Sequence, residues 1–414
     1  MKKTKILSKC LSLCIIFIIV SAGPVVFAQT YDLDRLVAEL EPEIEKIMLE
    51  GKIPSAAVAL VAGDQIIFSD AYGCSNLWAR PPATCSTVYL IGSTFKSMST
   101  YALLQQMEQG KFQLDDPVHK YLDDIKIQGQ DPDNPVTFRH LLSHTSGLPA
   151  AFGGHPVWGD TVPPPLTAYL RKNLKVQNPP LTRVVYSNLA YTLVAHLVEK
   201  FSGVPYKEYM QKNIFDPLEM TDMAFAPRPD MVERLAIPYI VNRQTQHHQP
   251  AVQTKADVWP AGIVYGTIKT QAHWLIVNLN NGFFKGRRLL KEETVQQMMT
   301  RQYDQFAGPL SAGWLNETTG YGLTWWISKR NEQTIFAHSG SVSGYTAFLA
   351  GNREQKTGFA VLTNGNRAHA HLFKLAVKAL DLMQKYQKQP DPQNHTKTPA
   401  PSPGADPLKT AIKK

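Results

Sequence analysis

Apolar residues near the start of the chain follow two different periods. Residues 33–49 carry them at helical spacing, and this run stops at Gly51. Residues 56–62 and 65–69 are short apolar stretches separated by a Gly-Asp pair, which is typical of a hairpin turn. The pattern therefore predicts a helix followed by a β-hairpin.

The middle of the chain is predicted to be mostly helical. Residues 93–107 and 189–201 have helical spacing, and the second run ends at Gly203. Residues 151–165, between these helices, are rich in glycine and proline. Such a composition predicts irregular surface chain, which often lines functional sites.

Three more strands and a last helix are predicted toward the C-terminus. The strands are residues 334–336, 345–350 and 358–363, joined by segments 340–344 and 352–356, and the helix is residues 368–384. The two strand groups therefore lie at opposite ends of the sequence. We expect an α/β fold of the α+β type, in which one mainly antiparallel sheet is built from N- and C-terminal segments, is flanked by helices and packs against a helical lobe.

Both ends of the chain depart from this globular pattern. Residues 1–28 combine four lysines with an apolar stretch and end in Val-Phe-Ala. They predict a cleaved signal peptide, export to the periplasm or beyond, and no membrane span after cleavage. Residues 387–414 are rich in proline and predict a disordered tail, which leaves residues 29–386 as one domain.

Composition and charge disfavour several classes of partner. The chain has 414 residues, enough to bury a sizeable core. Loss of residues 1–28, with four lysines and no acid, lowers the formal net charge from +9 to +5. No dense basic run remains, so nucleic-acid binding is disfavoured. We expect a monomer that binds a small-molecule or short-peptide substrate, which could derive from the cell wall.

Cysteines and histidines do not predict a metal site. Only Cys74 and Cys85 lie outside the predicted signal peptide. In an oxidising compartment they could form a disulfide, or they could be two separate small apolar side chains, and the sequence leaves both open. The histidines that could suggest a metal are His144, His155, His247 and His248. His144 lies in the segment 141–149, and His247 and His248 lie in a polar loop. We expect neither metal nor cofactor.

Ser93 and Lys96 are the first candidate catalytic pair, in the motif Ser-Thr-Phe-Lys. Residues three apart share a helix face, so the amine of Lys96 can reach the hydroxyl of Ser93. A serine hydroxyl needs a base to become a nucleophile, and a partly buried lysine can serve. The helix N-terminus adds a free backbone N–H that helps to hold an oxyanion. Taken singly, the motif fits an ordinary helix start equally well.

A second motif, Tyr186-Ser187-Asn188, precedes the predicted helix 189–201. Tyr186 beside a lysine can relay protons. Asn188 can bind a substrate amide or hold Lys96 in place. The alternative is a simple capped helix start.

A third motif, His338-Ser339-Gly340, is predicted to end a strand. His338 and Ser339 can donate hydrogen bonds to a substrate carboxylate or carbonyl, and Gly340 lets a substrate backbone lie close. The N–H of Ser341 could complete an oxyanion hole with that of Ser93. The alternative is a polar strand end with an ordinary turn.

The three motifs in this order resemble the serine β-lactamase and penicillin-binding-protein superfamily, in particular its class C β-lactamase, DD-peptidase and esterase-like branch. The resemblance runs from about residue 47 to 382 and includes the segments 141–149, 179–183, 320–323 and 362–364. It implies a β-lactamase/transpeptidase-like fold.

The resemblance also implies roles for the motif residues. Ser93 would form the acyl-enzyme, while Lys96 and Tyr186 would share its proton and later activate water. Asn188 would orient the substrate. The backbone amides of Ser93 and Ser341 would form the oxyanion hole.

Five positions depart from the family pattern. His338 replaces the lysine typical of β-lactamases, and a histidine is mostly neutral near pH 7, so a β-lactam carboxylate would lose a charged partner. The other departures are bulky Phe95 in place of a small hydroxyl residue, and Leu181, Ile263 and Thr324 in place of common glycines. They put the shape of the pocket in question more than the catalytic core.

We therefore expect an exported serine hydrolase that acts through an acyl-enzyme on small D-amino-acid peptides, esters or related amides. A DD-peptidase is slightly favoured over an esterase, because the motif at 338–340 suits a terminal carboxylate. Hydrolysis of β-lactams is expected to be slow or absent. One alternative is a penicillin- or peptidoglycan-binding protein of the same fold without turnover. The other is a structural envelope protein tethered by its proline-rich tail.

Overall fold

The structure is a computed structural model that describes residues 29–388, apart from positions 124, 152–154, 157–164, 253, 304–319, 331 and 367. By its contacts the chain divides into two units, Met1–Thr30 with Gln389–Lys414, and Tyr31–Lys388. The predicted signal peptide and nearly all of the predicted tail lie outside the described residues. All elements below belong to Tyr31–Lys388.

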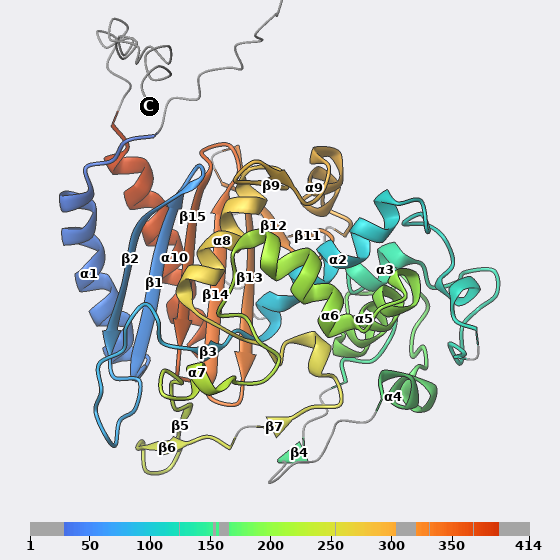
Figure 1. Ribbon diagram of the computed structural model, residues 1–414, viewed down its shortest axis with the longest axis horizontal. Coiled ribbons are helices and arrows are strands. Elements are labelled where there is room, and N and C mark those ends of the chain that lie inside the picture. Colours follow the sequence, from blue (N-terminus) through green and yellow to red (C-terminus); the bar gives the residue numbers. More distant parts are fainter. Residues whose placement is uncertain are drawn as a thin grey trace, which may run out of the picture. The chain divides into compact units, whose positions relative to one another are not determined.

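The described residues form a seven-stranded antiparallel sheet in the order β11-β12-β13-β14-β15-β1-β2 (Figure 1). Its strands are β1 Ser55–Ala62, β2 Gln65–Gly73, β11 Gly320–Tyr321, β12 Trp326–Arg330, β13 Gln333–Val342, β14 Tyr345–Asn352 and β15 Thr357–Thr363. The N-terminal hairpin joins the C-terminal strands through β1 and β15, with Ala59 opposite Ala360. The predicted sheet built from both ends of the chain is therefore confirmed.

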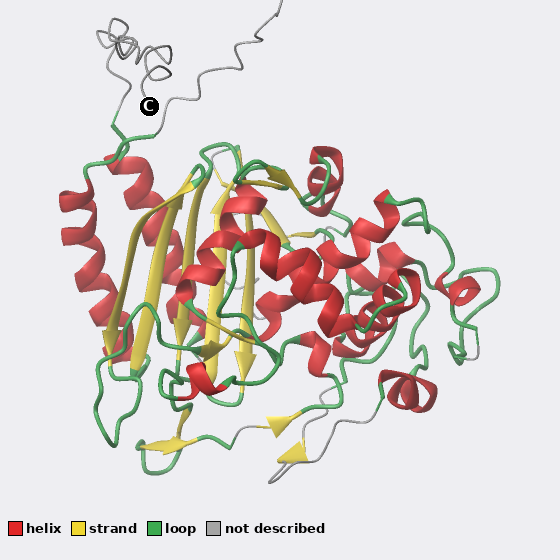
Figure 2. Cartoon of the chain, in the orientation of Figure 1, coloured by secondary structure: helices red, strands yellow, loops and turns green. Residues whose placement is uncertain are grey.

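Helices cover both faces of this sheet (Figure 2). Helices α1 (Leu33–Glu50) and α10 (His369–Tyr386) pack on one face, and α8 (Ile268–Leu279) and the helical lobe lie on the other. Side chains alternate across a strand, so the fully buried β1 supplies both cores. Its odd-numbered residues from 57 to 61 join the core on the lobe side, and its even-numbered residues from 56 to 62 pack beneath α1 and α10.

The lobe is built around α2 (Lys96–Glu108) and α5 (Asn188–Ser202), which contact each other. The remaining helices are α3 Phe138–Leu142, α4 Leu166–Asn173, α6 Tyr206–Met210, α7 Pro229–Val232 and α9 Glu292–Met298, with a π-helical turn at Gln211–Phe215. Short 3₁₀ turns are Gly92–Phe95, Val118–Tyr121, Asp216–Leu218 and Trp259–Ala261. Two-residue to three-residue strands pair as β3 Tyr89–Leu90 with β8 Tyr265–Gly266, β4 His155–Pro156 with β7 Thr254–Lys255, β5 Tyr239–Val241 with β6 His248–Pro250, and β9 Phe283–Phe284 with β10 Arg287–Arg288.

Three details differ from the sequence predictions. The strand predicted at 334–336 continues to Val342, so residues 338–341 lie within β13 rather than in a turn. The predicted helix at 93 begins as a 3₁₀ turn, and the α-helix starts at Lys96. Gln387 still pairs with Tyr31, so the described fold includes the first residue assigned to the tail.

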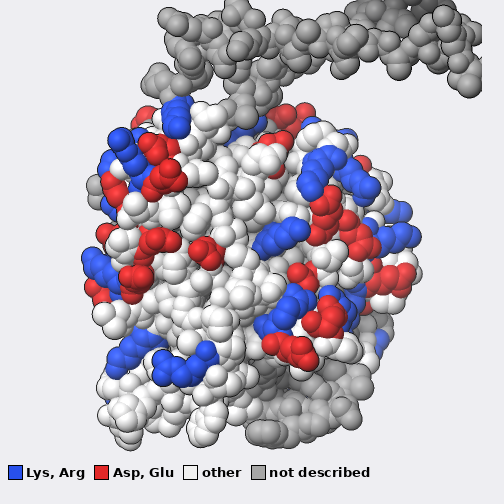
Figure 3. Space-filling view, turned by 60° about the vertical axis from the view of Figure 1, so that its left-hand side comes forward, with Lys and Arg blue, Asp and Glu red and all other residues white. Residues whose placement is uncertain are grey.

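The cysteines and the surface add three observations. Cys74 and Cys85 are both free thiols, which answers the question that the sequence left open. Among the described residues, no helix is both long and apolar enough to cross a bilayer. Over most of the face drawn in Figure 3, basic and acidic side chains are intermingled rather than separated by sign.

Candidate active site

The 3₁₀ turn Gly92–Phe95 brings Ser93 and Lys96 into direct contact. Gly92 has φ 58°, a left-handed conformation that glycine adopts without steric cost. The Nζ of Lys96 donates to the Ser93 Oγ at 2.9 Å and to the Ala261 carbonyl at 2.7 Å. Lys96 is fully buried, whereas Ser93 remains partly exposed. A buried amine therefore contacts the hydroxyl of a serine that is partly exposed.

Burial determines the charge state of Lys96. It lowers the pKa of this amine well below its ordinary value, because the charged form loses its hydration. Aromatic rings surround the amine, with the ring centres of Tyr186 and Tyr191 at 4.9 and 5.6 Å from Nζ. A lowered pKa increases the neutral fraction that can accept a proton from Ser93.

Tyr186 lies beside this pair with its hydroxyl buried. Burial raises the pKa of the phenol well above its ordinary value, and the neighbouring Ser93 hydroxyl offsets only part of that shift. The Tyr186 hydroxyl nevertheless has no partner with hydrogen-bond geometry. We therefore describe Tyr186 and Ser93 as neighbours rather than as a bonded pair, and the resting phenol as protonated.

The backbone of β13 packs directly against the nucleophile turn. A Cβ on Gly340 would lie 2.1 Å from the Ile91 carbonyl oxygen and 3.0 Å from the Ser93 nitrogen. A Cβ on Gly92 would lie 2.6 Å from the Ser341 nitrogen. The two predicted oxyanion-hole amides, of Ser93 and Ser341, thus belong to elements in close contact. Gly340 makes room for the chain's own turn at Gly92–Phe95, whereas the sequence had assigned that space to a substrate.

His338 is placed differently from the expectation of a substrate-facing donor. Its side chain is fully buried, and its ring stacks on that of Trp326 at 4.9 Å between centres. Its Nδ1 lies 2.6 Å from the Ser339 carbonyl oxygen, so it donates there, and its Nε2 lies 3.5 Å from the Tyr321 hydroxyl. Burial, together with the charge of Lys96, lowers the pKa of His338 to about 3. The imidazole is therefore neutral at physiological pH.

The remaining predicted site residues are placed on the flanks of the pair. Asn188 begins α5, and its side-chain amide donates to the Ala151 carbonyl at 3.1 Å. The structure records no bond between Asn188 and Lys96; the amine is held by Ala261 instead. Ser339 is half-buried and Ser341 exposed on β13.

Among the departures from the family pattern, one is buried in an aromatic cluster and two have a left-handed backbone conformation. Phe95 is fully buried in an aromatic cluster with Tyr206, Phe215 and Phe225. Leu181 and Thr324 have φ of 65° and 82°, conformations that favour the glycine they replace. Thr324 has a compensating contact, because its hydroxyl accepts from the Tyr191 hydroxyl at 2.8 Å.

Sequence reasoning missed two supports of this site. The Ala261 carbonyl that binds Lys96 carries no side-chain signal, so no motif could have identified it. The sequence singled out His144 only as a possible metal ligand within the segment 141–149, although its ring centre lies 4.2 Å from that of Tyr186. The described residues contain no cluster of three or more His, Cys, Asp or Glu side chains that could hold a metal ion.

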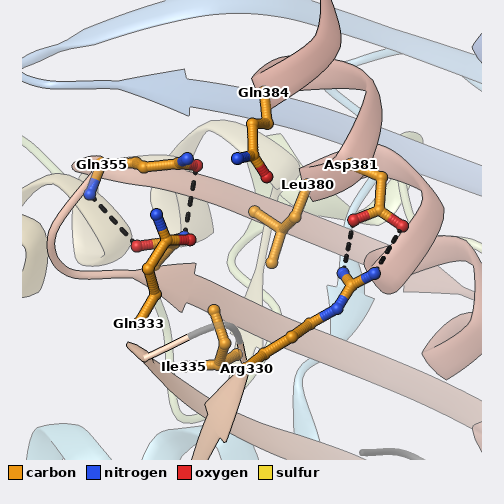
Figure 4. A pocket seen from close by; sticks show the side chains of 8 residues that line it. Arg330, Gln333, Ile335, Gln355, Leu380, Asp381 and Gln384 are labelled. Atoms are coloured by element: carbon orange, nitrogen blue, oxygen red, sulfur yellow. Dashed lines mark hydrogen bonds and ion pairs between the residues drawn. The ribbon is translucent and has the colours of Figure 1, made fainter.

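A pocket on another part of the sheet is separate from these residues (Figure 4). It lies between β12, β13 and α10, and most of its polar side chains are paired with one another. Arg330 forms an ion pair with Asp381, and the Asn352 amide donates to Gln333 and Gln355. Nothing in that lining converges with Ser93, so the catalytic hypothesis stays with the Ser93–Lys96 pair.

Comparisons with known proteins identify the family and the fold of the chain. The family model described as Beta-lactamase matches residues 34–383. Protein flp of Staphylococcus aureus (strain N315) is 22% identical over 80% of this chain, which spans 64% of the length of that relative. The D-alanyl-D-alanine-carboxypeptidase/endopeptidase AmpH of Escherichia coli (strain K12) is 26% identical over 74% of this chain and 78% of its own length. The octameric penicillin-binding protein homologue from Pyrococcus abyssi has a similar structure, with TM-score 0.71 and 29% identity over 85% of this chain and 78% of that one.

Proposed function

The chain belongs to the beta-lactamase family, and on that basis we propose that it is a serine hydrolase with Ser93 as nucleophile and Lys96 as base. The observation that carries the proposal is the 2.9 Å contact between a buried amine and the hydroxyl of a partly exposed serine. The proposed substrates are small D-amino-acid peptides, esters or related amides. The proposed location is the periplasm or the outside of the cell.

The proposed reaction has two halves. In the first, neutral Lys96 takes the proton of Ser93, whose Oγ attacks the substrate carbonyl, and the amides of Ser93 and Ser341 hold the oxyanion. Collapse of this intermediate breaks the bond to the leaving group, which receives a proton from Lys96 directly or through Tyr186. In the second half, water loses a proton to the same groups and attacks the ester, which releases the acid and restores Ser93.

The position of His338 bears on the choice of substrate. A buried neutral imidazole supplies no cation for a substrate carboxylate. This supports esters and uncharged amides, whereas the similarity to AmpH supports peptides that end in D-alanine. We therefore propose both classes as substrates and expect slow hydrolysis of β-lactams. A panel of a short-chain ester, a D-Ala-D-Ala peptide and a chromogenic cephalosporin ranks them by kcat/KM.

The nucleophile is tested with a fluorescent fluorophosphonate. We expect Ser93→Ala to abolish covalent labelling, because no other serine has a buried lysine amine recorded on its hydroxyl among the described residues. Ser341→Ala is the matched control: it removes an exposed hydroxyl on the facing strand and keeps the backbone amide, so labelling should persist. Full labelling of Ser93→Ala would refute the assignment.

Turnover separates the enzyme from a binding protein of the same fold. A penicillin label on Ser93 should fade with time as the acyl-enzyme hydrolyses, and esters should be consumed in many turnovers per protein molecule. A permanent label without ester turnover would favour the penicillin- or peptidoglycan-binding alternative.

A further inference from the structure

His144 is a fully buried histidine that the proposed reaction does not use. It has φ 59°, in the left-handed region where histidine is among the better tolerated side chains. Its pKa is lowered well below the ordinary value by burial and by the neighbouring Lys96, so the ring is neutral. A buried polar group in a strained conformation beside reacting groups calls for a physical explanation.

Two hydrogen bonds link His144 to the residues that flank Tyr186. The N–H of Val185 donates to the His144 carbonyl at 2.8 Å, and the N–H of Ser187 donates to its Nδ1 at 3.1 Å. The imidazole ring itself packs on the Tyr186 ring, with centres 4.2 Å apart and planes inclined by 39°. His144 thus packs its ring on Tyr186 and also accepts hydrogen bonds from the two residues on either side of Tyr186.

These contacts also determine the tautomer. Because Nδ1 accepts from Ser187, a neutral ring must carry its proton on Nε2. That Nε2 is buried without a hydrogen-bond partner, among the rings of Tyr186, Tyr191 and Tyr321. The ring therefore holds the phenol by packing and by its single acceptor, not by a bond to the phenol oxygen.

We propose that His144 is a positioning residue that holds the Tyr186 phenol beside Ser93 for proton transfer. The inference rests on the proposed function, in which Tyr186 relays protons. It predicts that His144 acts through Tyr186 alone. A side chain needed only for folding would instead act independently of the phenol.

A double-mutant cycle tests this prediction. The substitution is His144→Gly, since glycine tolerates φ 59° and removes both the ring and the acceptor. Acylation rates of the full chain are measured with a chromogenic ester and divided by the fraction of sites that a covalent label titrates, which corrects for misfolded protein. We expect His144→Gly to slow acylation about 10–100-fold, as for a misplaced catalytic group. In a Tyr186→Phe background the same change should have almost no further effect.

Two more variants separate positioning from structure. In His144→Asn, the Oδ1 takes the place of Nδ1 and asparagine tolerates the left-handed conformation, so most of the rate should return. His140→Gly is the matched control, because His140 lies four residues earlier and its Nδ1 also accepts a backbone N–H, that of Thr137. The labelled fraction of this variant should be acylated at the wild-type rate. If His144→Gly does not fold, His144→Phe keeps a ring and removes the acceptor in the same cycle.

The outcomes are distinct. Equal rate losses from His144→Gly with and without the Tyr186 hydroxyl would overturn the inference, as would failure of His144→Asn to recover the rate. In either case an active wild type would leave the proposed function intact. A wild type that is never acylated would overturn the proposed function and this inference together.

Discussion

At the scale of single residues, burial rather than ion pairing tunes the groups around Ser93. Lys96 and His338 both lose basicity because their charged forms are taken out of water. For Lys96 this favours the neutral amine that the proposed reaction uses as a base, and for His338 it leaves a neutral ring that supplies no cation. The same physical cause therefore supports acyl transfer and disfavours carboxylate recognition.

Replacing Lys96 should slow catalysis strongly and stabilise the protein. We expect Lys96→Met to lower the rate of acylation about 10²–10⁴-fold, the range for a lost proton-transfer group. It should also raise the free energy of unfolding by about 0.5–2 kcal/mol at pH 7, since a buried amine no longer has to lose its proton on folding. Rates of label incorporation and urea unfolding curves measure the two effects.

The pH dependence of that stabilisation follows from the pKa shift. The folded protein has a lowered Lys96 pKa, and the unfolded chain keeps the ordinary 10.5. Between these values the unfolded state binds more protons, so wild-type stability decreases as the pH falls through this window. The advantage of Lys96→Met should therefore grow from pH 10 to pH 7 and vanish above pH 10.5. A constant difference over this range would contradict a buried, proton-accepting amine.

At the scale of elements, the site depends on how closely the turn at Gly92–Phe95 approaches β13. Gly340 permits this approach, and Ser341 follows it on the same strand. The helix α5 fixes the other side, because the Ser187 hydroxyl caps it by accepting from the Ala190 N–H at 3.0 Å. Tyr186 directly precedes this cap, so the position at which α5 begins determines where the phenol lies.

A methyl group on Gly340 should separate the turn from the strand. Its Cβ would lie 2.1 Å from the backbone oxygen of Ile91, which cannot move without displacing Ser93. We expect Gly340→Ala to lower the free energy of unfolding by about 1–3 kcal/mol and the acylation rate about 10²-fold. Gly358→Ala, on β15 of the same sheet, is the control, since the atoms nearest to its Cβ belong to the side chains of Leu275 and Leu279, at 3.1 Å or more, and not to the backbone. Equal activity of the two variants would show that the close approach is not needed.

At the scale of the whole molecule, the two ends of the described fold close on each other. The N–H of Asp32 donates to the Tyr386 carbonyl at 3.0 Å, and α1 packs along α10. Within the sheet, the pairing of β1 with β15 likewise joins the N-terminal segment to the C-terminal segment. The sheet that carries β13 is therefore complete only when the chain is folded up to α10.

Truncation tests where the functional fold ends. We expect removal of residues 390–414 to leave kcat/KM and the melting temperature unchanged, because the described fold ends before this segment. Removal of residues 369–414 should prevent folding, since α10 buries Leu372, Leu375 and Met383 against the sheet. Loss of activity after removal of residues 390–414 alone would instead favour the structural envelope protein that is tethered by its tail.

The sequence by itself determined the elements and the chemistry of short segments. Helical and alternating periods depend on local geometry, so the N-terminal hairpin, α5 and the last helix were predicted within a few residues. The contact of Ser93 with Lys96 was equally predictable, because residues three apart on a helical turn must lie on one face.

Only the tertiary structure decided what lies beside that pair. Three features depend on segments that lie far apart in the chain. They are the burial of His338, the hydrogen bond from Lys96 to the Ala261 carbonyl and the packing of Gly340 on Ile91. Periodicity carries no information on such contacts, since they depend on how the sheet and the lobe pack. The role of His144 became visible for the same reason: its partners Val185 and Ser187 lie about forty residues away in sequence and within hydrogen-bonding distance in space.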